Sequence, residues 1–181
     1  DRSFLKNDLN LILQDPVLLE ALPVARTYIA AYKLLETPST ETFVNLTAAL
    51  DQYHPLFEKE ELSSLYQCAL NHCIRCINAG QMEAYADALT LYRRLIDRGL
   101  LLQHGGRLSQ WTYKNIATTG LRSGAFEWTE TFLHQYRDAL SPAERDNAFA
   151  FNLASLYFEK QDLALTLETL QNVEFTDFTY H

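Results

Sequence analysis

The sequence predicts an all-α fold in which antiparallel helix-turn-helix repeats stack into a right-handed superhelix, an α-solenoid. The first observation is an internal repeat, because three segments align on an asparagine that is followed nine residues later by the centre of a turn. The aligned pairs are Asn71 and Gly80, Asn115 and Gly124, and Asn152 and Gln161. Apolar residues recur at helical spacing on both sides of these turns, and strand signals such as sustained alternation are nearly absent.

The chain opens with two predicted helices. Residues 1–14 place apolar side chains on one face, as an amphipathic helix does. Asp15 and Pro16 then have the residue types of a helix cap and a first helical position, and the second helix runs to Glu36. Because proline lacks an amide hydrogen, we expect Pro23 to kink this helix or to split off a short first turn.

Two breaks delimit the next helices. Thr37-Pro38-Ser39 ends the preceding helix, and residues 40–53 follow with the spacing of an amphipathic helix. His54-Pro55 breaks the chain again, before the charged run at 58–61 opens a long helix to Ala79. The inward positions expected in 40–53 are Phe43, Leu46, Leu50 and Tyr53.

Helices and turns alternate in the rest of the chain. A helix over 81–98 is expected to end at Gly99, because glycine readily adopts the positive φ that often follows a helix. Residues 100–108 form the one substantial loop, and its Gly105-Gly106-Arg107 stretch is interpreted as a flexible connector. The next helix begins at Gln110.

Capping residues mark the later helices. Ser141-Pro142-Ala143-Glu144 combines a serine cap, a proline at the first helical position and a glutamate three residues after the cap. Asp162 and Asp177 stand where the following helices should be capped. Glycine at two of the three aligned turns is expected, whereas Gln161 at the third costs free energy.

Units of about 34 residues have the period of tetratricopeptide repeats. The best single unit, Asn152 to Leu170, contains Asn-Leu-Ala-x-x-Tyr and a later Leu-x-x-Leu. The spacing of small residues in the units also resembles that of this repeat family, in which such residues stand where the paired helices approach most closely: Cys73, Ala117 and Ala154. The chain thus resembles a divergent tetratricopeptide-repeat (TPR) protein, which implies a TPR-like α-α solenoid. Thr129 and Thr166 replace the usual second-helix alanine, and the motif's terminal proline is missing.

Several longer segments also resemble an uncharacterised bacterial family of the Bacteroidetes type. They are Asn71-His72-Cys73-Ile74, Trp111-Thr112-Tyr113-Lys114-Asn115-Ile116, Leu156-Tyr157-Phe158-Glu159-Lys160 and Leu170-Gln171-Asn172-Val173-Glu174-Phe175. The resemblance covers about the last two-thirds of the chain. It implies further helices after His181 and brings no known activity with it.

Length and composition indicate one globular domain. The chain has 181 residues, 48% hydrophobic and 21% charged, and no Gly-, Ser- or Pro-rich linker divides it. We therefore expect residues 1–181 to form a single α-solenoid domain, the N-terminal part of a longer helical repeat protein. No apolar run approaches the ~20 residues of a membrane span, so no membrane partner is predicted.

Charge and cysteine content bear on partners and compartment. The formal net charge of −8 disfavours sequence-independent binding to nucleic acid, whose phosphates need clustered Lys and Arg. Three cysteines, Cys68, Cys73 and Cys76, fall in one predicted helix, and an odd number does not suit a disulfide framework. A reducing, cytoplasmic location is the simplest interpretation.

The sharpest candidate for chemistry is His72 with Cys73 and Cys76, whose spacing could contribute to a zinc site. A closed zinc site needs four ligands, and no second Cys-x-x-Cys or His-x-x-x-His occurs. A buried thiol packing as a small apolar group is the favoured interpretation. No phosphate-binding, nucleophile-elbow, zinc-protease or calcium-loop motif is present, so we predict no enzyme, catalytic residue, metal or cofactor.

The aligned asparagines have two interpretations. They could grip a peptide backbone or carboxylate, as in some TPR proteins, or bond a carbonyl of a neighbouring turn and fix repeat geometry, which is favoured. Lys114 with Asn152 would partly reproduce a carboxylate clamp, although Thr118 replaces its usual asparagine. The expected concave-face binding residues are Asn78, Lys114, Thr118, Arg122, Asn152, Ser155 and Glu159.

A non-enzymatic scaffold that binds a protein or peptide is the function predicted from stacked repeats, because they build extended concave surfaces. The alternative is an RNA-binding protein of pentatricopeptide type. Tyr113-Lys114-Asn115-Ile116 and Leu91-Tyr92-Arg93-Arg94-Leu95-Ile96 resemble such repeats, whose side chains recognise one base per repeat. The irregular repeat length and the acidic charge disfavour it.

Overall fold

A computed structural model describes residues 22–102 and 105–173. The chain divides into two compact units, Asp1–Ala79 and Gly80–His181, and each is described by itself. Eight α-helices and two short 3₁₀ helices make up the secondary structure of the described residues, which contain no strand, so the all-α prediction is confirmed. Three predictions fall outside the described residues. They are the helix over residues 1–14, the first part of the following helix over residues 15–21, and the cap at Asp177.

The first unit contains three α-helices. They are α3 (Pro23–Glu36), α4 (Thr40–Tyr53) and α5 (Lys59–Asn78), with the 3₁₀ helix η1 (His54–Leu56) between the last two. Pro23 occupies the start of α3, where its missing amide hydrogen costs nothing. Ser39 caps α4 by accepting a hydrogen bond from the Thr42 amide at 3.2 Å, so the predicted bounds of this helix are confirmed.

The apolar faces of α3, α4 and α5 pack against one another. Because residues three or four apart lie on one face of a helix, Leu46 and Leu50 of α4 are both completely buried. Tyr66 and Ala69, three residues apart on α5, are also completely buried. Of the inward positions expected in α4, only Tyr53 is half-exposed.

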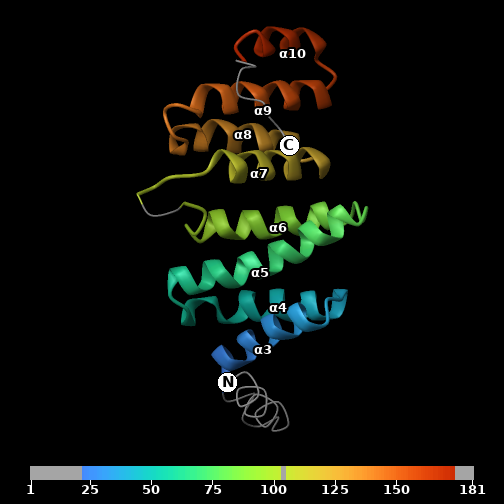
Figure 1. Ribbon diagram of the computed structural model, residues 1–181, viewed down its shortest axis with the longest axis vertical. Coiled ribbons are helices and arrows are strands. Elements are labelled where there is room, and N and C mark those ends of the chain that lie inside the picture. The colour runs from blue at the N-terminus through green and yellow to red at the C-terminus, as the bar shows by residue number, and fades with distance from the viewer. Residues whose placement is uncertain (1–21, 103–104, 174–181) are drawn as a thin grey trace. The chain divides into compact units, whose positions relative to one another are not determined.

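Helices of the second unit follow one another in chain order, each antiparallel to the one before (Figure 1). They are α6 (Ala84–Asp97), α7 (Gln110–Arg122), α8 (Phe126–Tyr136), η2 (Arg137–Ala139), α9 (Arg145–Glu159) and α10 (Leu163–Leu170). Helix α7 packs against α6, α8 and α9, while α9 also contacts α8 and α10.

Two predicted helix starts are wrong by a few residues. Helix α6 begins at Ala84 rather than Gln81, because the residues before it form turns closed by bonds such as the Ala84 amide to the Gln81 carbonyl at 3.2 Å. Helix α9 begins at Arg145. Ser141 does not cap an amide there; its hydroxyl donates to the Glu144 carboxylate at 2.8 Å, and the residues between them form a turn.

Positive φ angles occur at all three aligned turns, as expected. Gly80 and Gly124 have φ of 85° and 69°, and Gln161 has φ of 62°. A side chain crowds the backbone in this conformation, so Gln161 is strained where glycine is not. The next residue, Asp162, caps α10 by accepting a hydrogen bond from the Leu165 amide at 3.0 Å, which confirms the predicted cap.

Gly120 of α7 lies against Thr129 of α8 in the α7–α8 hairpin. A Cβ atom added to Gly120 would lie 2.1 Å from the Thr129 hydroxyl oxygen, so only glycine fits. The Thr129 hydroxyl donates to the Ala125 carbonyl one turn earlier, and the buried Thr166 donates to the Asp162 carbonyl. Each threonine therefore satisfies its own hydroxyl inside its helix.

The loop before α7 is packed at its two ends, whereas Gly105, Gly106 and Arg107 in its described middle part are exposed. Leu100, Leu101 and Leu108 are buried. The Leu108 amide donates to the Ala139 carbonyl at 2.9 Å, which joins this loop to the end of η2. The sequence did not predict this contact, because it joins segments far apart in the chain.

Replacing Gly120 by alanine should destabilise the chain by about 1–3 kcal/mol, because the new methyl group overlaps the Thr129 hydroxyl. The measurement is the free energy of unfolding in urea, with a double-mutant cycle to Thr129→Ala. In the Thr129→Ala background the cost of Gly120→Ala should fall, since the overlapping oxygen is gone. Equal costs in both backgrounds would contradict the proposed overlap.

Replacing Gln161 by glycine should stabilise the chain by up to about 1 kcal/mol, because the positive φ no longer crowds a Cβ atom. Thermal unfolding measures the change. The matched control is Lys160→Gly, at the preceding residue with φ of −75°, where glycine only loosens the unfolded chain and should destabilise. A lower melting temperature for Gln161→Gly would contradict the strain.

Candidate functional site

A groove of about 410 Å³ lies between α7, α9 and α10. Helix α7 supplies residues one turn apart, and α9 supplies residues at successive turns of one face, because helical spacing aligns them. The apolar lining residues are Leu121, Phe151, Ala154, Phe158 and Leu170. The polar lining residues are Thr118, Arg122, Ser155, Glu159 and Thr166. The groove thus has apolar walls with polar groups at defined positions, as ligand-binding grooves commonly have.

Two cationic side chains of α7 lie against α9 beside this groove. The Arg122 guanidinium is 3.7 Å from the Glu159 carboxylate, and both side chains are partly exposed. The Lys114 ammonium lies 6.0 Å from the ring centroid of Phe151, within the range of a cation–π contact. An ion pair and a cation–π contact between α7 and α9 therefore lie beside the groove.

Four of the seven residues predicted for a binding face line this groove together: Thr118, Arg122, Ser155 and Glu159. Lys114 lies beside them against Phe151. Asn152 is buried, and its side-chain amide donates to the Ala148 carbonyl of the same helix at 2.7 Å. It is not among the residues that line the groove. Asn78 is exposed at the end of α5, in the other unit.

The aligned asparagines do not share one environment. Asn152 bonds a carbonyl one turn earlier, which matches the geometric interpretation. Asn71 is exposed and accepts a hydrogen bond from the Gln67 side chain at 2.9 Å, while Asn115 is exposed. The small residues two positions later are buried in all three segments, so they are the consistent feature of the repeat: Cys73, Ala117 and Ala154.

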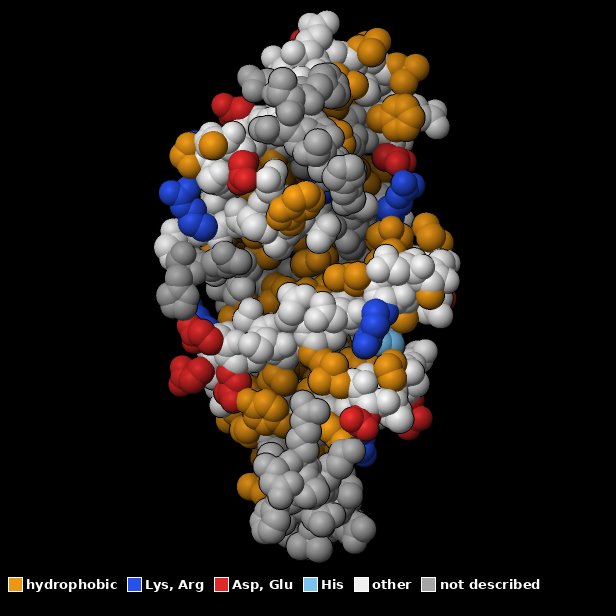
Figure 2. Space-filling view, viewed as in Figure 1, with side chains coloured by type: hydrophobic (Ala, Val, Ile, Leu, Met, Phe, Trp, Pro, Cys, Tyr) orange, Lys and Arg blue, Asp and Glu red, His pale blue; other side chains and the backbone are white. Residues whose placement is uncertain are grey.

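Sequence reasoning missed the apolar walls. Phe158 is 60% exposed although it is a large aromatic residue, and Leu163 and Leu167 of α10 are exposed to a similar extent. Figure 2 shows hydrophobic side chains gathered over α10 and the adjoining part of α9. The available signal was the run of leucines in residues 163–170, which leaves apolar positions on more than one face of a short helix.

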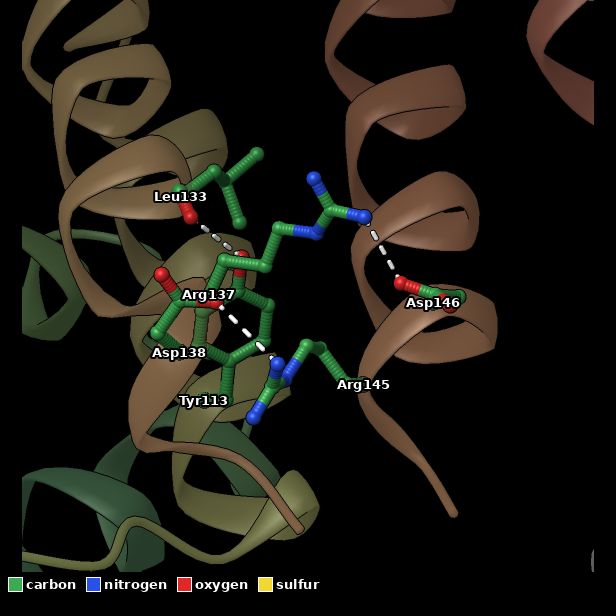
Figure 3. A network of polar contacts seen from close by, with 6 residues as sticks. All are labelled: Tyr113, Leu133, Arg137, Asp138, Arg145 and Asp146. Carbon is green, nitrogen blue, oxygen red and sulfur yellow. Dashed lines mark hydrogen bonds and ion pairs between the residues drawn. The ribbon is translucent and has the colours of Figure 1, made fainter. Parts of the chain in front are cut away.

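A polar network connects α7, α8 and α9 (Figure 3). The buried Tyr113 hydroxyl donates to the Leu133 carbonyl at 2.7 Å, and burial raises the pKa of this phenol above its ordinary value. Arg137 pairs with Asp146 at 2.7 Å and Arg145 with Asp138 at 3.3 Å. The hydrogen bond to Asp146 raises the pKa of Arg137 above its ordinary value. These contacts join α7 to α8 and η2 to α9.

The described residues contain no group of three His, Cys, Asp or Glu side chains arranged to hold a metal ion. Of the residues weighed for zinc, Cys73 is buried, and the Cys76 sulfur lies 3.5 Å from Nε2 of His72. Over residues 22–102 and 105–173, every helix is too short or too polar to cross a lipid bilayer.

Replacing Arg122 or Glu159 by alanine should change the free energy of unfolding by less than about 1 kcal/mol, because their ion pair is exposed to solvent. Urea unfolding monitored by circular dichroism measures this. Leu133→Ala is the positive control, since this fully buried side chain should cost about 2–5 kcal/mol. A loss above about 2 kcal/mol for Arg122→Ala would mean that the pair holds the fold together rather than lining an adaptable groove.

Searches against protein-family models, curated proteins and solved structures each gave no significant match. The geometry of the groove and the packing of the helices are therefore the observations from which a function can be argued.

Proposed function

We propose that this chain is a non-enzymatic scaffold, built from TPR-like repeats, that binds a segment of another protein in the groove between α7, α9 and α10. Helix packing supports the repeat architecture. Helix α3 contacts both α4 and α5, and α7 contacts both α8 and α9, so within each unit a helix packs on the next two. Stacked helical hairpins produce this pattern, because each hairpin covers the apolar face that its neighbour leaves open.

The groove is the single observation that carries the proposal. Phe158 stands exposed at its edge, while Phe151 and Leu170 form half-buried walls. A large exposed aromatic residue beside an apolar groove is a feature of protein-binding surfaces, since burying it on binding is favourable. An apolar side chain of a partner would fill the groove.

Charges around the groove restrict the partner further. Lys114 and Arg122 lie on one face of α7, and Glu159 of α9 offsets part of the charge of Arg122, so the groove edge carries two cations and one anion, whereas the chain as a whole carries a formal net charge of −8. A peptide with an acidic residue next to a bulky apolar residue would meet both features, because opposite charges steer association and fix register. The same acidic balance weighs against an RNA partner.

The proposal can be tested by selecting peptides from a displayed random library on the whole chain and measuring their affinity by fluorescence anisotropy. Phe158→Ser should weaken binding at least about tenfold, which corresponds to about 1.4 kcal/mol. Leu35→Ser is the matched control, because Leu35 of α3 is 58% exposed, close to the 60% of Phe158, and lies in the other unit.

Equal affinity of the two variants for a selected peptide would contradict the groove as the site. A library that yields no binding peptide at all would contradict the scaffold function. Arg122→Glu tests the charge preference, since it should weaken peptides that contain an acidic residue more than peptides that lack one.

A further inference from the structure

Three thiols on helix α5 have different surroundings. Cys73 is 1% exposed, whereas Cys68 and Cys76 are half-buried. The Cys68 sulfur donates to the Ala31 carbonyl of α3 at 3.9 Å, and burial raises the pKa of this thiol. The Cys76 sulfur instead lies 3.5 Å from Nε2 of His72. Cys76 is thus the thiol of the three that combines partial exposure with an adjacent imidazole.

The imidazole is held firmly in place. His72 is only 9% exposed, and its ring stacks on Phe43 of α4, with centroids 5.2 Å apart and an angle of 21° between the planes. Its position one helical turn before Cys76 directs Nε2 at the sulfur. In the tautomer that carries its proton on Nδ1, His72 accepts the thiol proton through Nε2.

We propose that Cys76 is a site of oxidation by hydrogen peroxide, with His72 as its proton acceptor. Nε2 of His72 takes the thiol proton as the sulfur attacks one peroxide oxygen. The S–O bond forms, the O–O bond breaks, and the leaving hydroxide takes the proton back from the imidazolium. The products are a sulfenic acid on Cys76 and water, so the sulfur loses two electrons and the peroxide gains them.

The other two thiols lack this arrangement. Cys73 is closed to solvent, and a thiol with a raised pKa, as at Cys68, supplies less of the nucleophilic thiolate. The inference does not depend on the binding function proposed above, because these cysteines lie on α5, in the unit that does not contain the groove.

The experiment treats the whole chain with hydrogen peroxide in the presence of dimedone, which traps sulfenic acids, and measures the trapping rate at each cysteine by mass spectrometry. Cys76 should react several-fold faster in the folded chain than in the chain unfolded by urea, because only folding fixes the imidazole beside it. Cys68 and Cys73 should react more slowly in the folded chain. A Cys76 rate that rises or stays unchanged on unfolding would overturn the proposal.

His72→Gln tests the proton acceptor, and should lower the Cys76 rate about tenfold or more, because general-base assistance is lost. If His72 served only to fill space, its replacement would loosen the helix and raise the rates at Cys76 and Cys73 together, which would overturn the role. Cys68→Ser is the control that should leave the Cys76 rate unchanged. If His72→Gln does not fold, the proposal is tested by the ratio of the Cys76 trapping rates in the folded and the unfolded unsubstituted chain.

Discussion

The close approach of paired helices is the constraint on which the rest of the second unit depends. A short helix cannot bury its own apolar stripe, so neighbouring helices must approach until the stripes meet. Gly120 allows this approach in the α7–α8 hairpin, where even one methyl group would overlap Thr129. The buried Ala117 and Ala154 leave room in the same way. Small side chains at these positions determine how near the helices lie.

The groove follows from the same packing. Helix α9 contacts α7, α8 and α10, so one of its faces is buried while the face with Phe151, Ser155 and Glu159 borders the groove. Helix α10 contacts α9, and its Thr166 and Leu170 line the groove. Phe158, at the edge of the groove, is exposed. The groove therefore lies where α9 borders both α7 and α10.

Local signals were sufficient for most helix bounds and insufficient for the contacts between them. The bounds of α4 and the cap at Asp162 were predictable, because each depends on residues within one turn. The start of α9 was not predictable in this way, because the Ser141 hydroxyl donates to the Glu144 carboxylate instead of accepting a hydrogen bond from a helix amide. Thr118 and Arg122 could be assigned to one face by helical spacing, but Leu170 reaches the groove only through tertiary packing, which a sequence pattern does not encode.

The backbone hydrogen bond from Leu108 to Ala139 has a consequence for how the second unit opens. The turn at Gly124 closes the α7–α8 hairpin at one end, and this bond ties the segment before α7 to the end of η2 at the other. Separating the two helices therefore requires this bond to break as well. The Leu108 amide lies outside any helix, yet it should exchange more slowly than the exposed amides of the same loop, because its hydrogen bond must open first.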